Sequence, residues 1–320
     1  MKRSIHIAAV AAVILAAGCN RGPDTTATTT SPANGADESM RQDQAFMLEE
    51  QAWRDQRRER LLQPDGWTSL IGLHWIQPGD HFVGSAPGNG MRIAMGPPEL
   101  GRLALKDGVV RFFPSEGAGA TVDGEPANAP VVLRSDADPE GPSVIGFGDG
   151  DGKATVIERH GRLALRVRHA LAPTRVNFAG LDYWPAAKEW QVEGRFVAHP
   201  PGRTIEIADI IGGTEPLPNP GAIEFTRDGR TYRIEAIDEG DTLFLVFADR
   251  TNGHGSYPAG RFMDVPQPDA DGRVLLDFNR AYNPPCAFTA FATCPLPPPE
   301  NRLDLAIPAG EKAYSKSPHA

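Results

Sequence analysis

The sequence is poor in cysteine, in positive charge and in long apolar runs. Only 3 of its 320 residues are cysteine, and 32 Lys and Arg face 41 Asp and Glu, which gives a net charge of −9. An acidic chain does not attract nucleic acid, so we expect no nucleic-acid partner. The N-terminal apolar run, residues 5–17, is shorter than the roughly 20 residues that a membrane-spanning helix needs.

Several enzyme and metal-binding motifs are also missing. No Gly-x-Ser-x-Gly or Ser-x-x-Lys sequence occurs, so the serine-hydrolase templates do not fit. The histidines are scattered and form no zinc-like cluster, so we predict neither a metal site nor a cofactor. The glycine-rich stretch 146–152 precedes a strand and lacks the Gly-Lys-Ser/Thr ending of a phosphate loop, which favours a plain turn.

Glycine and proline are abundant instead, with 34 and 30 residues. So many helix breakers exclude a mainly helical protein, while 40 % hydrophobic residues exclude overall disorder. We therefore predict a mainly β protein with a sandwich- or barrel-like body. Period-two patterns predict strands at 102–106, 109–113, 131–134, 155–159, 163–168, 205–210, 223–226, 231–237, 242–247, 274–278 and 303–307.

The N-terminus has the anatomy of an export signal, with Lys2 and Arg3 before the apolar run. The following Leu15-Ala16-Ala17-Gly18-Cys19 resembles a bacterial lipobox. The resemblance implies a lipoprotein whose Cys19 is acylated and whose membrane attachment is through lipid. Asn20 in place of Asp then favours the outer membrane, with the body facing the periplasm. An ordinary cleaved signal with a coincidental cysteine is the alternative.

Changes in composition divide the chain into five segments. Residues 1–18 are the signal peptide, and 19–42 are predicted to be a flexible stalk because they hold almost no large apolar side chain. Residues 43–170 hold a helix at 43–62 and a sandwich-like β part. Residues 171–314 hold a second β part, and 315–320 are a tail. Phe46, Trp53 and Leu61 give the helix an apolar stripe, which predicts that it docks on the body.

The segment 257–312 is the candidate site, because a proline-rich loop in it is dense in polar residues. Proline fixes the backbone, and polar groups held in a rigid loop must pair with one another or with a ligand. A self-satisfied structural network and a preorganised pocket both remain open. The candidate catalytic residues are Asp277, Glu300 and Arg280, and the candidate binding residues are Arg261, Asn279, Arg280, Tyr282, Asn283, Glu300, Asn301 and Arg302.

Cys286 and Cys294 are the only cysteines after Cys19. Export places them in an oxidising compartment, so we predict a disulfide between them. It would close a loop of about nine residues and contribute roughly 2–3 kcal/mol. Two free thiols, one of them reactive, are the alternative.

The same segment resembles the domain-of-unknown-function family 1684. The resemblance is carried by Asp277-Phe278-Asn279-Arg280-Ala281-Tyr282-Asn283-Pro284-Pro285-Cys286, by Cys294-Pro295-Leu296-Pro297-Pro298 and by Glu300-Asn301-Arg302-Leu303. Upstream, residues 67–75 fit the same family, so the resemblance covers about residues 45–314. It implies no activity, because the family is named for having none assigned.

Two functional classes follow. The first is a lipid-anchored envelope protein that acts as a ligand-binding or accessory module, with a small ligand or an envelope protein as the partner of the 277–302 loop. The second is an envelope hydrolase with a carboxylate and arginine site in that loop, since such clusters do acid–base work when their pKa values are tuned.

Overall fold

The computed structural model describes residues 32–318, with side chains from Asp37 onward. The predicted signal peptide, Cys19 and the first part of the predicted stalk lie outside the described residues. Within residues 32–318, no helix is both long enough and apolar enough to cross a bilayer. The chain divides into one compact unit up to Gln44 and a second from Ala45 to Ala320.

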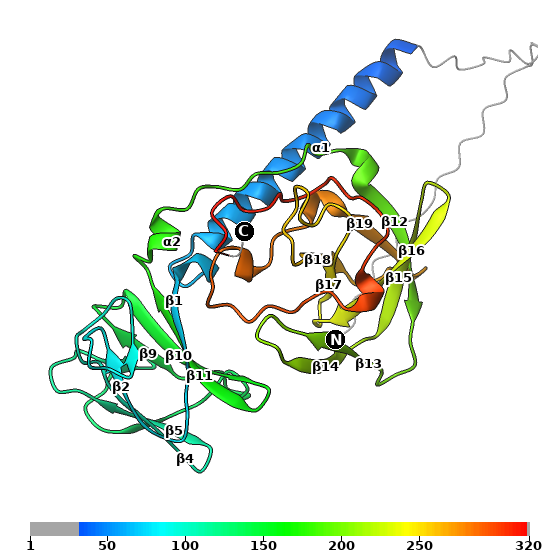
Figure 1. The fold of residues 1–320 in the computed structure, drawn as a ribbon. Coiled ribbons are helices and arrows are strands. Elements are labelled where there is room, and N and C mark those ends of the chain that lie inside the picture. Colours follow the sequence, from blue (N-terminus) through cyan, green and yellow to red (C-terminus); the bar gives the residue numbers. More distant parts are fainter. Residues whose placement is uncertain (1–31, 319–320) are drawn as a thin grey trace, which may run out of the picture. The chain divides into compact units, whose positions relative to one another are not determined.

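Helix α1 (Pro32–Leu61) begins earlier than predicted, so residues 32–42 are helical rather than part of a stalk. The physical reason is that Ala, Glu, Met, Arg and Gln dominate residues 36–42, and all of these favour helix. In the second unit, Phe46 and Leu61 are buried and Trp53 is half-buried, so the predicted docking stripe is confirmed. Figure 1 shows this end of α1 against the β-rich body.

The N-terminal β part is a sandwich of two sheets around one apolar core (Figure 1). A six-stranded sheet has the order β1-β11-β10-β9-β6-β7 and a five-stranded sheet the order β3-β2-β4-β5-β8. The strands are β1 (Leu70–Trp75), β2 (Gly79–Gly84), β3 (Met91–Arg92), β4 (Gly101–Lys106), β5 (Val109–Pro114), β6 (Thr121–Val122), β7 (Glu125–Pro126), β8 (Val131–Leu133), β9 (Val144–Phe147), β10 (Gly152–Arg159) and β11 (Arg162–His169).

The C-terminal β part is a nearly closed, barrel-like sheet with the order β18-β17-β16-β15-β12-β19, whose end strands β18 and β19 lie close together. The strands are β12 (Gln191–Ala198), β15 (Gly221–Arg227), β16 (Arg230–Asp238), β17 (Thr242–Phe247), β18 (Arg261–Pro266) and β19 (Arg273–Asp277), beside a hairpin of β13 (Thr204–Ala208) and β14 (Thr214–Pro218). Short helices are α2 (Pro173–Val176), η1 (Trp67–Ser69), η2 (Lys188–Trp190), η3 (Phe278–Arg280), η4 (Pro285–Ala287) and η5 (Pro299–Asn301).

The mainly β fold with sandwich- and barrel-like parts is thus confirmed, but two predicted strands need correction. Residues 303–307 form no strand, because they make only isolated main-chain hydrogen bonds and no continuous ladder: the amide of Leu303 donates to Ala248, and Leu305 accepts from Arg250. Strand β11 has both faces covered rather than one, since Ala164 and Arg166 are buried as well as Leu165. One apolar cluster lies mainly before the boundary that we place at 170–171 and a second lies after it, while a third joins Leu61 to residues beyond 200, so the boundary itself stays a prediction.

Candidate functional site

The candidate catalytic residues Asp277 and Arg280 belong to an ion-pair cluster that fixes α1 on the barrel. The guanidinium Nε of Arg280 lies 2.9 Å from Oε1 of Glu50 and 3.4 Å from Oδ2 of Asp277. Asp277 also accepts from the amide of Asn279 and from Gln191. Burial and the charge of Asp277 raise the pKa of Glu50. This cluster joins α1, β12 and β19, and it leaves the carboxylate of Asp277 with few free lone pairs for a substrate.

Arg261 is fully buried, so it is a structural residue rather than a binding residue. Its Nη2 lies 2.6 Å from Oδ2 of Asp249, whose side chain is fully buried too. The same guanidinium donates to the carbonyls of Ile307 and Ala309. These contacts tie β18 to the irregular chain after residue 303.

The three candidate asparagines are buried and bonded largely to the main chain. Asn279 exchanges hydrogen bonds with the backbone of Ala187, and Asn283 donates to the carbonyl of Lys312. Asn301 accepts from the amide of Glu235 and donates to two carbonyls, at 2.7 to 2.9 Å. Amides of this kind satisfy buried main-chain groups where the chain leaves regular structure.

The remaining candidates do not meet in one place. The Tyr282 hydroxyl donates to Asp264 at 2.9 Å, and its ring lies against Arg57. Glu300 and Arg302 are exposed, and in the described part of the chain no hydrogen bond or ion pair joins Glu300 to Arg280. The structure therefore does not bring Glu300, Asp277 and Arg280 together as the hydrolase hypothesis requires.

Cys286 and Cys294 are both free, buried thiols, so the predicted disulfide is not formed in this structure. The loop does bring the two residues together: the amide of Cys286 donates to Sγ of Cys294 at 3.1 Å. The hydrogen bond from the Cys294 thiol lowers the pKa of Cys286 and raises that of Cys294. Closing a bond between the two sulfurs needs a two-electron oxidant.

A cavity of about 270 Å³ lies where the two β parts meet. Arg159 at the end of β10 and Arg166 within β11 line it, hairpin β13–β14 and strands β17 and β18 supply apolar side chains, and the loop supplies Thr293 and Cys294. Trp67 of η1 also lines it. The 277–302 loop thus lines a cavity, but through residues 285 and 293–295 rather than through its charged candidates.

Two arginines converge on one hydroxyl in this cavity. Nε of Arg159 lies 3.3 Å and Nη2 of Arg166 lies 3.2 Å from Oγ1 of Thr293. Arg159 is held from behind by Asp136 at 2.8 Å. Arg166 also lies over the ring of Trp67, with 5.5 Å between Cζ and the ring centroid. The arginines are therefore positioned by fixed neighbours rather than by solvent.

Arg166 is buried without a counterion. Only 6 % of the residue is exposed, and its Nε has no hydrogen-bond partner in the described structure. Burial, helped by the charges of Arg159 and Arg168, lowers its pKa to about 10. A buried cation is costly unless it is paired, so this arrangement is suited to receive an anion.

Two other polar groups at this cavity, His160 and Asp209, are paired with each other. His160 lies 2.7 Å from Asp209, which also accepts from the amides of Ile211 and Gly213. Among the described residues, no group of three or more His, Cys, Asp or Glu side chains is placed to hold a metal.

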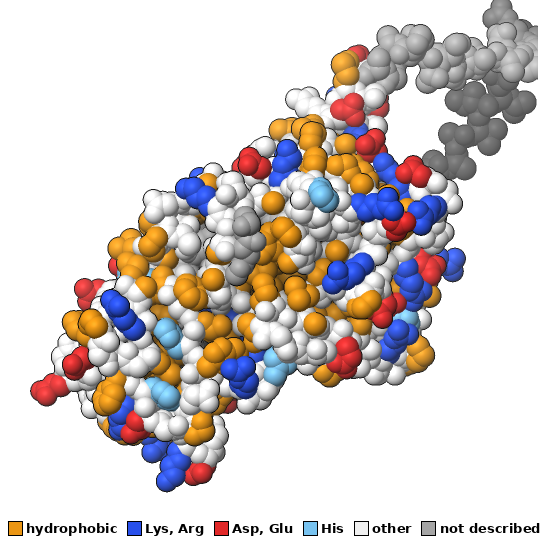
Figure 2. Space-filling view, viewed as in Figure 1, with side chains coloured by type: hydrophobic (Ala, Val, Ile, Leu, Met, Phe, Trp, Pro, Cys, Tyr) orange, Lys and Arg blue, Asp and Glu red, His pale blue; other side chains and the backbone are white. Residues whose placement is uncertain are grey.

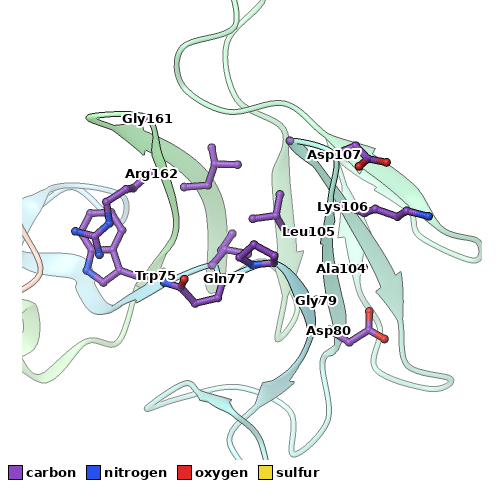
Figure 3. A pocket seen from close by; sticks show the side chains of 14 residues that line it. Trp75, Gln77, Gly79, Asp80, Ala104, Leu105, Lys106, Asp107, Gly161 and Arg162 are labelled. Carbon is purple, nitrogen blue, oxygen red and sulfur yellow. The ribbon is translucent and has the colours of Figure 1, made fainter.

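A wider groove of about 760 Å³ lies in the N-terminal β part. Figure 3 shows Asp80, Lys106 and Asp107 pointing away from its apolar floor, while Arg162 covers Trp75 with 4.0 Å between Cζ and the ring centroid. Its charged groups do not converge, so it offers no specific chemistry. Figure 2 shows charges of both signs scattered over the visible face.

Sequence reasoning missed Arg159, Arg166 and Thr293. The period-two pattern of β11 puts Arg166 on the face opposite Leu165 and Val167, and a pattern of this kind is typical of a strand with one exposed face. Nothing in one strand indicates that a second β part covers that face.

Residues 176–312 match the family described as "Protein of unknown function (DUF1684)". The upstream part of the expected resemblance, residues 45–175, stays a prediction. An uncharacterized protein from gene locus rrnAC0354 of Haloarcula marismortui, solved by solution NMR, is 33 % identical; the match covers 44 % of this chain and 80 % of that one, with a TM-score of 0.37. No curated protein matches. Neither description names an activity, so function must be argued from the site.

Proposed function

We propose that this protein is a binding module for a small anion, which it holds between Arg159 and Arg166 beside Thr293. The observation that carries the proposal is the buried Arg166, whose Nε has no partner while a second arginine donates to the same hydroxyl. A carboxylate or phosphate accepts from two guanidinium groups at once and replaces the missing counterion.

The apolar wall of the cavity favours an anion with an organic body. Phe244 and Phe262 pack edge to face, with 4.9 Å between ring centroids, and both line the cavity together with Leu217. Small-ligand sites combine such walls with a few fixed polar groups. An aromatic carboxylate, with its ring on the phenylalanines and its oxygens at the arginines, fits this division.

Calorimetric titration with para-toluate tests the proposal. The wild-type protein is expected to bind one equivalent, and Arg166→Met is expected to lose about tenfold or more in affinity, as the loss of a charge-assisted hydrogen bond predicts. Arg302→Met, which changes an exposed arginine outside the cavity, is the matched control and should bind as wild type. Equal binding by wild type and Arg166→Met would contradict the proposal.

We further propose that the module is lipid-anchored at Cys19 and works in the cell envelope, at the outer membrane facing the periplasm. The lipobox-like residues 15–19 support this placement. Cys19→Ser should move the protein from the membrane fraction to the soluble periplasmic fraction. Wild-type protein without acyl mass at its N-terminus would refute the anchor.

A further inference from the structure

The cavity has a wider neighbour, a groove of about 790 Å³ with which it shares part of its wall. Five residues line both spaces: Trp67, Glu239, Phe244, Phe262 and Pro285. Arg159 and Arg166 line the cavity and not the groove, whereas Trp53 of α1 lines the groove and not the cavity. The shared residues make the two spaces adjacent, so a ligand too long for the cavity of about 270 Å³ extends into the groove.

The surface that the groove offers to a ligand is largely aromatic. Four aromatic side chains that line it are half-buried, so part of each stays accessible: Trp53, Trp67, Phe244 and Tyr282. The groove is also lined by the buried side chains of Leu61, Phe262 and Phe288. Covering accessible apolar surface of this kind is favourable, and a contiguous patch of it marks a binding site.

The charged groups of the two spaces call for one anionic group and no more. Arg57 of the groove is paired with Glu311 at 2.8 Å, and Arg159 of the cavity with Asp136 at 2.8 Å. Other charged side chains that line the two spaces are exposed to solvent: Arg60, Asp65, His160, Glu215, Glu239 and Asp264. Exposed charges contribute little to binding. Arg166, by contrast, is buried and has no counterion among residues 32–318.

We propose that the ligand is an elongated amphiphile with a carboxylate at one end and an apolar tail, and that the tail lies in the groove. The inference rests on the proposed function, which places the carboxylate at Arg159 and Arg166. The tail passes the shared side chains of Phe244 and Phe262 and covers the accessible faces of Trp53 and the other half-buried aromatic side chains. The chemical class is a carboxylate with an alkyl chain, such as a fatty acid or a para-alkylbenzoate.

Two probes with the same charged end separate this inference from the proposed function. Para-toluate ends in a methyl group, and para-pentylbenzoate carries four more methylenes. Complete burial of one methylene strengthens binding about fourfold, and half burial in an open groove about twofold, so the wild-type protein should bind para-pentylbenzoate about tenfold to twentyfold more tightly in a calorimetric titration. Trp53→Ala should reduce this gain at least threefold and leave the affinity for para-toluate unchanged.

Trp75→Ala is the matched control, because Trp75 is also half-buried but lines neither space. It should keep the gain. Equal affinities of the wild type for the two probes would overturn the inference, while para-toluate binding that depends on Arg166 would still support the proposed function. The same gain in Trp53→Ala as in the wild type would overturn the assignment of the tail to the groove.

A measurement on the wild type keeps the inference testable even if Trp53→Ala does not fold. In an NMR titration, para-pentylbenzoate should shift the indole N–H signal of Trp53, which Trp53→Phe assigns by its loss, and para-toluate should leave it in place. A Trp53 signal that does not move while para-pentylbenzoate binds would overturn the inference.

Discussion

Arg166 is predicted to cost the free protein stability that ligand binding recovers. Its pKa of about 10, instead of 12.5, corresponds to roughly 3 kcal/mol by which burial disfavours the charged form. Replacement by methionine removes this penalty. It also removes one hydrogen bond to Thr293, which contributes about 1.5–3 kcal/mol when the donor is charged, and the contact with Trp67. The relieved burial penalty and the lost contacts nearly cancel, so Arg166→Met should change the free energy of unfolding by no more than about 1 kcal/mol.

Urea denaturation of the ligand-free protein measures this change, and Arg57→Met is the matched control. Arg57 is also a buried arginine, but it is paired with a fully buried Glu311 and donates to the carbonyl of Asn283. Its removal leaves Glu311 buried without its counterion, so we expect a loss of about 3–5 kcal/mol. If Arg166→Met lost as much stability as Arg57→Met, Arg166 would be a structural cross-link and the reasoning would fail.

Three further predictions concern groups other than Arg166. Arg261→Met should destabilise the protein by about 3–5 kcal/mol, because it leaves the carboxylate of Asp249 buried without its counterion. Arg302→Ala, at an exposed arginine, should cost less than about 0.5 kcal/mol. Urea denaturation compares the two variants, and equal losses of stability would contradict the assignment of Arg261 as structural. Burial and the charge of Asp277 raise the pKa of Glu50. The wild type should therefore lose stability relative to Glu50→Gln as the pH rises from 4.5 through that raised pKa. If the free energy of unfolding of Glu50→Gln, relative to that of the wild type, does not grow between about pH 4 and pH 7, this prediction is wrong. If the protein is exported, as we propose, Cys286 and Cys294 should take up no alkyl group until a reductant is added, because their thiols are adjacent. Mass spectrometry of the purified protein showing two alkyl groups without reductant would rule out the disulfide.

The general fold could be predicted because its signals are local. The dipeptides Asp107-Gly108 and Asp228-Gly229 have positive φ at both residues, as tight hairpin turns require, and they lie between the strands that the period-two patterns predict. The apolar stripe of α1 likewise predicted which side of the helix would be buried. Such patterns depend on residues within a few positions of one another.

The candidate site could be predicted only in part because its partners are distant in sequence. The sequence predicts a segment dense in polar residues at 277–302 but not their partners: Arg280 pairs with Glu50, 230 residues away, and Arg166 meets Thr293 across 127 residues. A polar residue in a loop looks the same whether its partner is a ligand or a distant side chain. Burial distinguishes these cases, and burial depends on how the two β parts come together.

Side-chain NMR of the arginine Nε–H groups tests the central claim most directly. Among residues 32–318, no group accepts a hydrogen bond from Nε of Arg166, whereas Nε of Arg57 donates to Glu311 at 2.8 Å. Titration with para-toluate should shift the Arg166 signal, with saturation at one equivalent, and leave the Arg57 signal in place; Arg166→Met assigns the signal by its loss. An Arg166 signal that does not move while para-toluate binds elsewhere would contradict an anion site at Arg159 and Arg166.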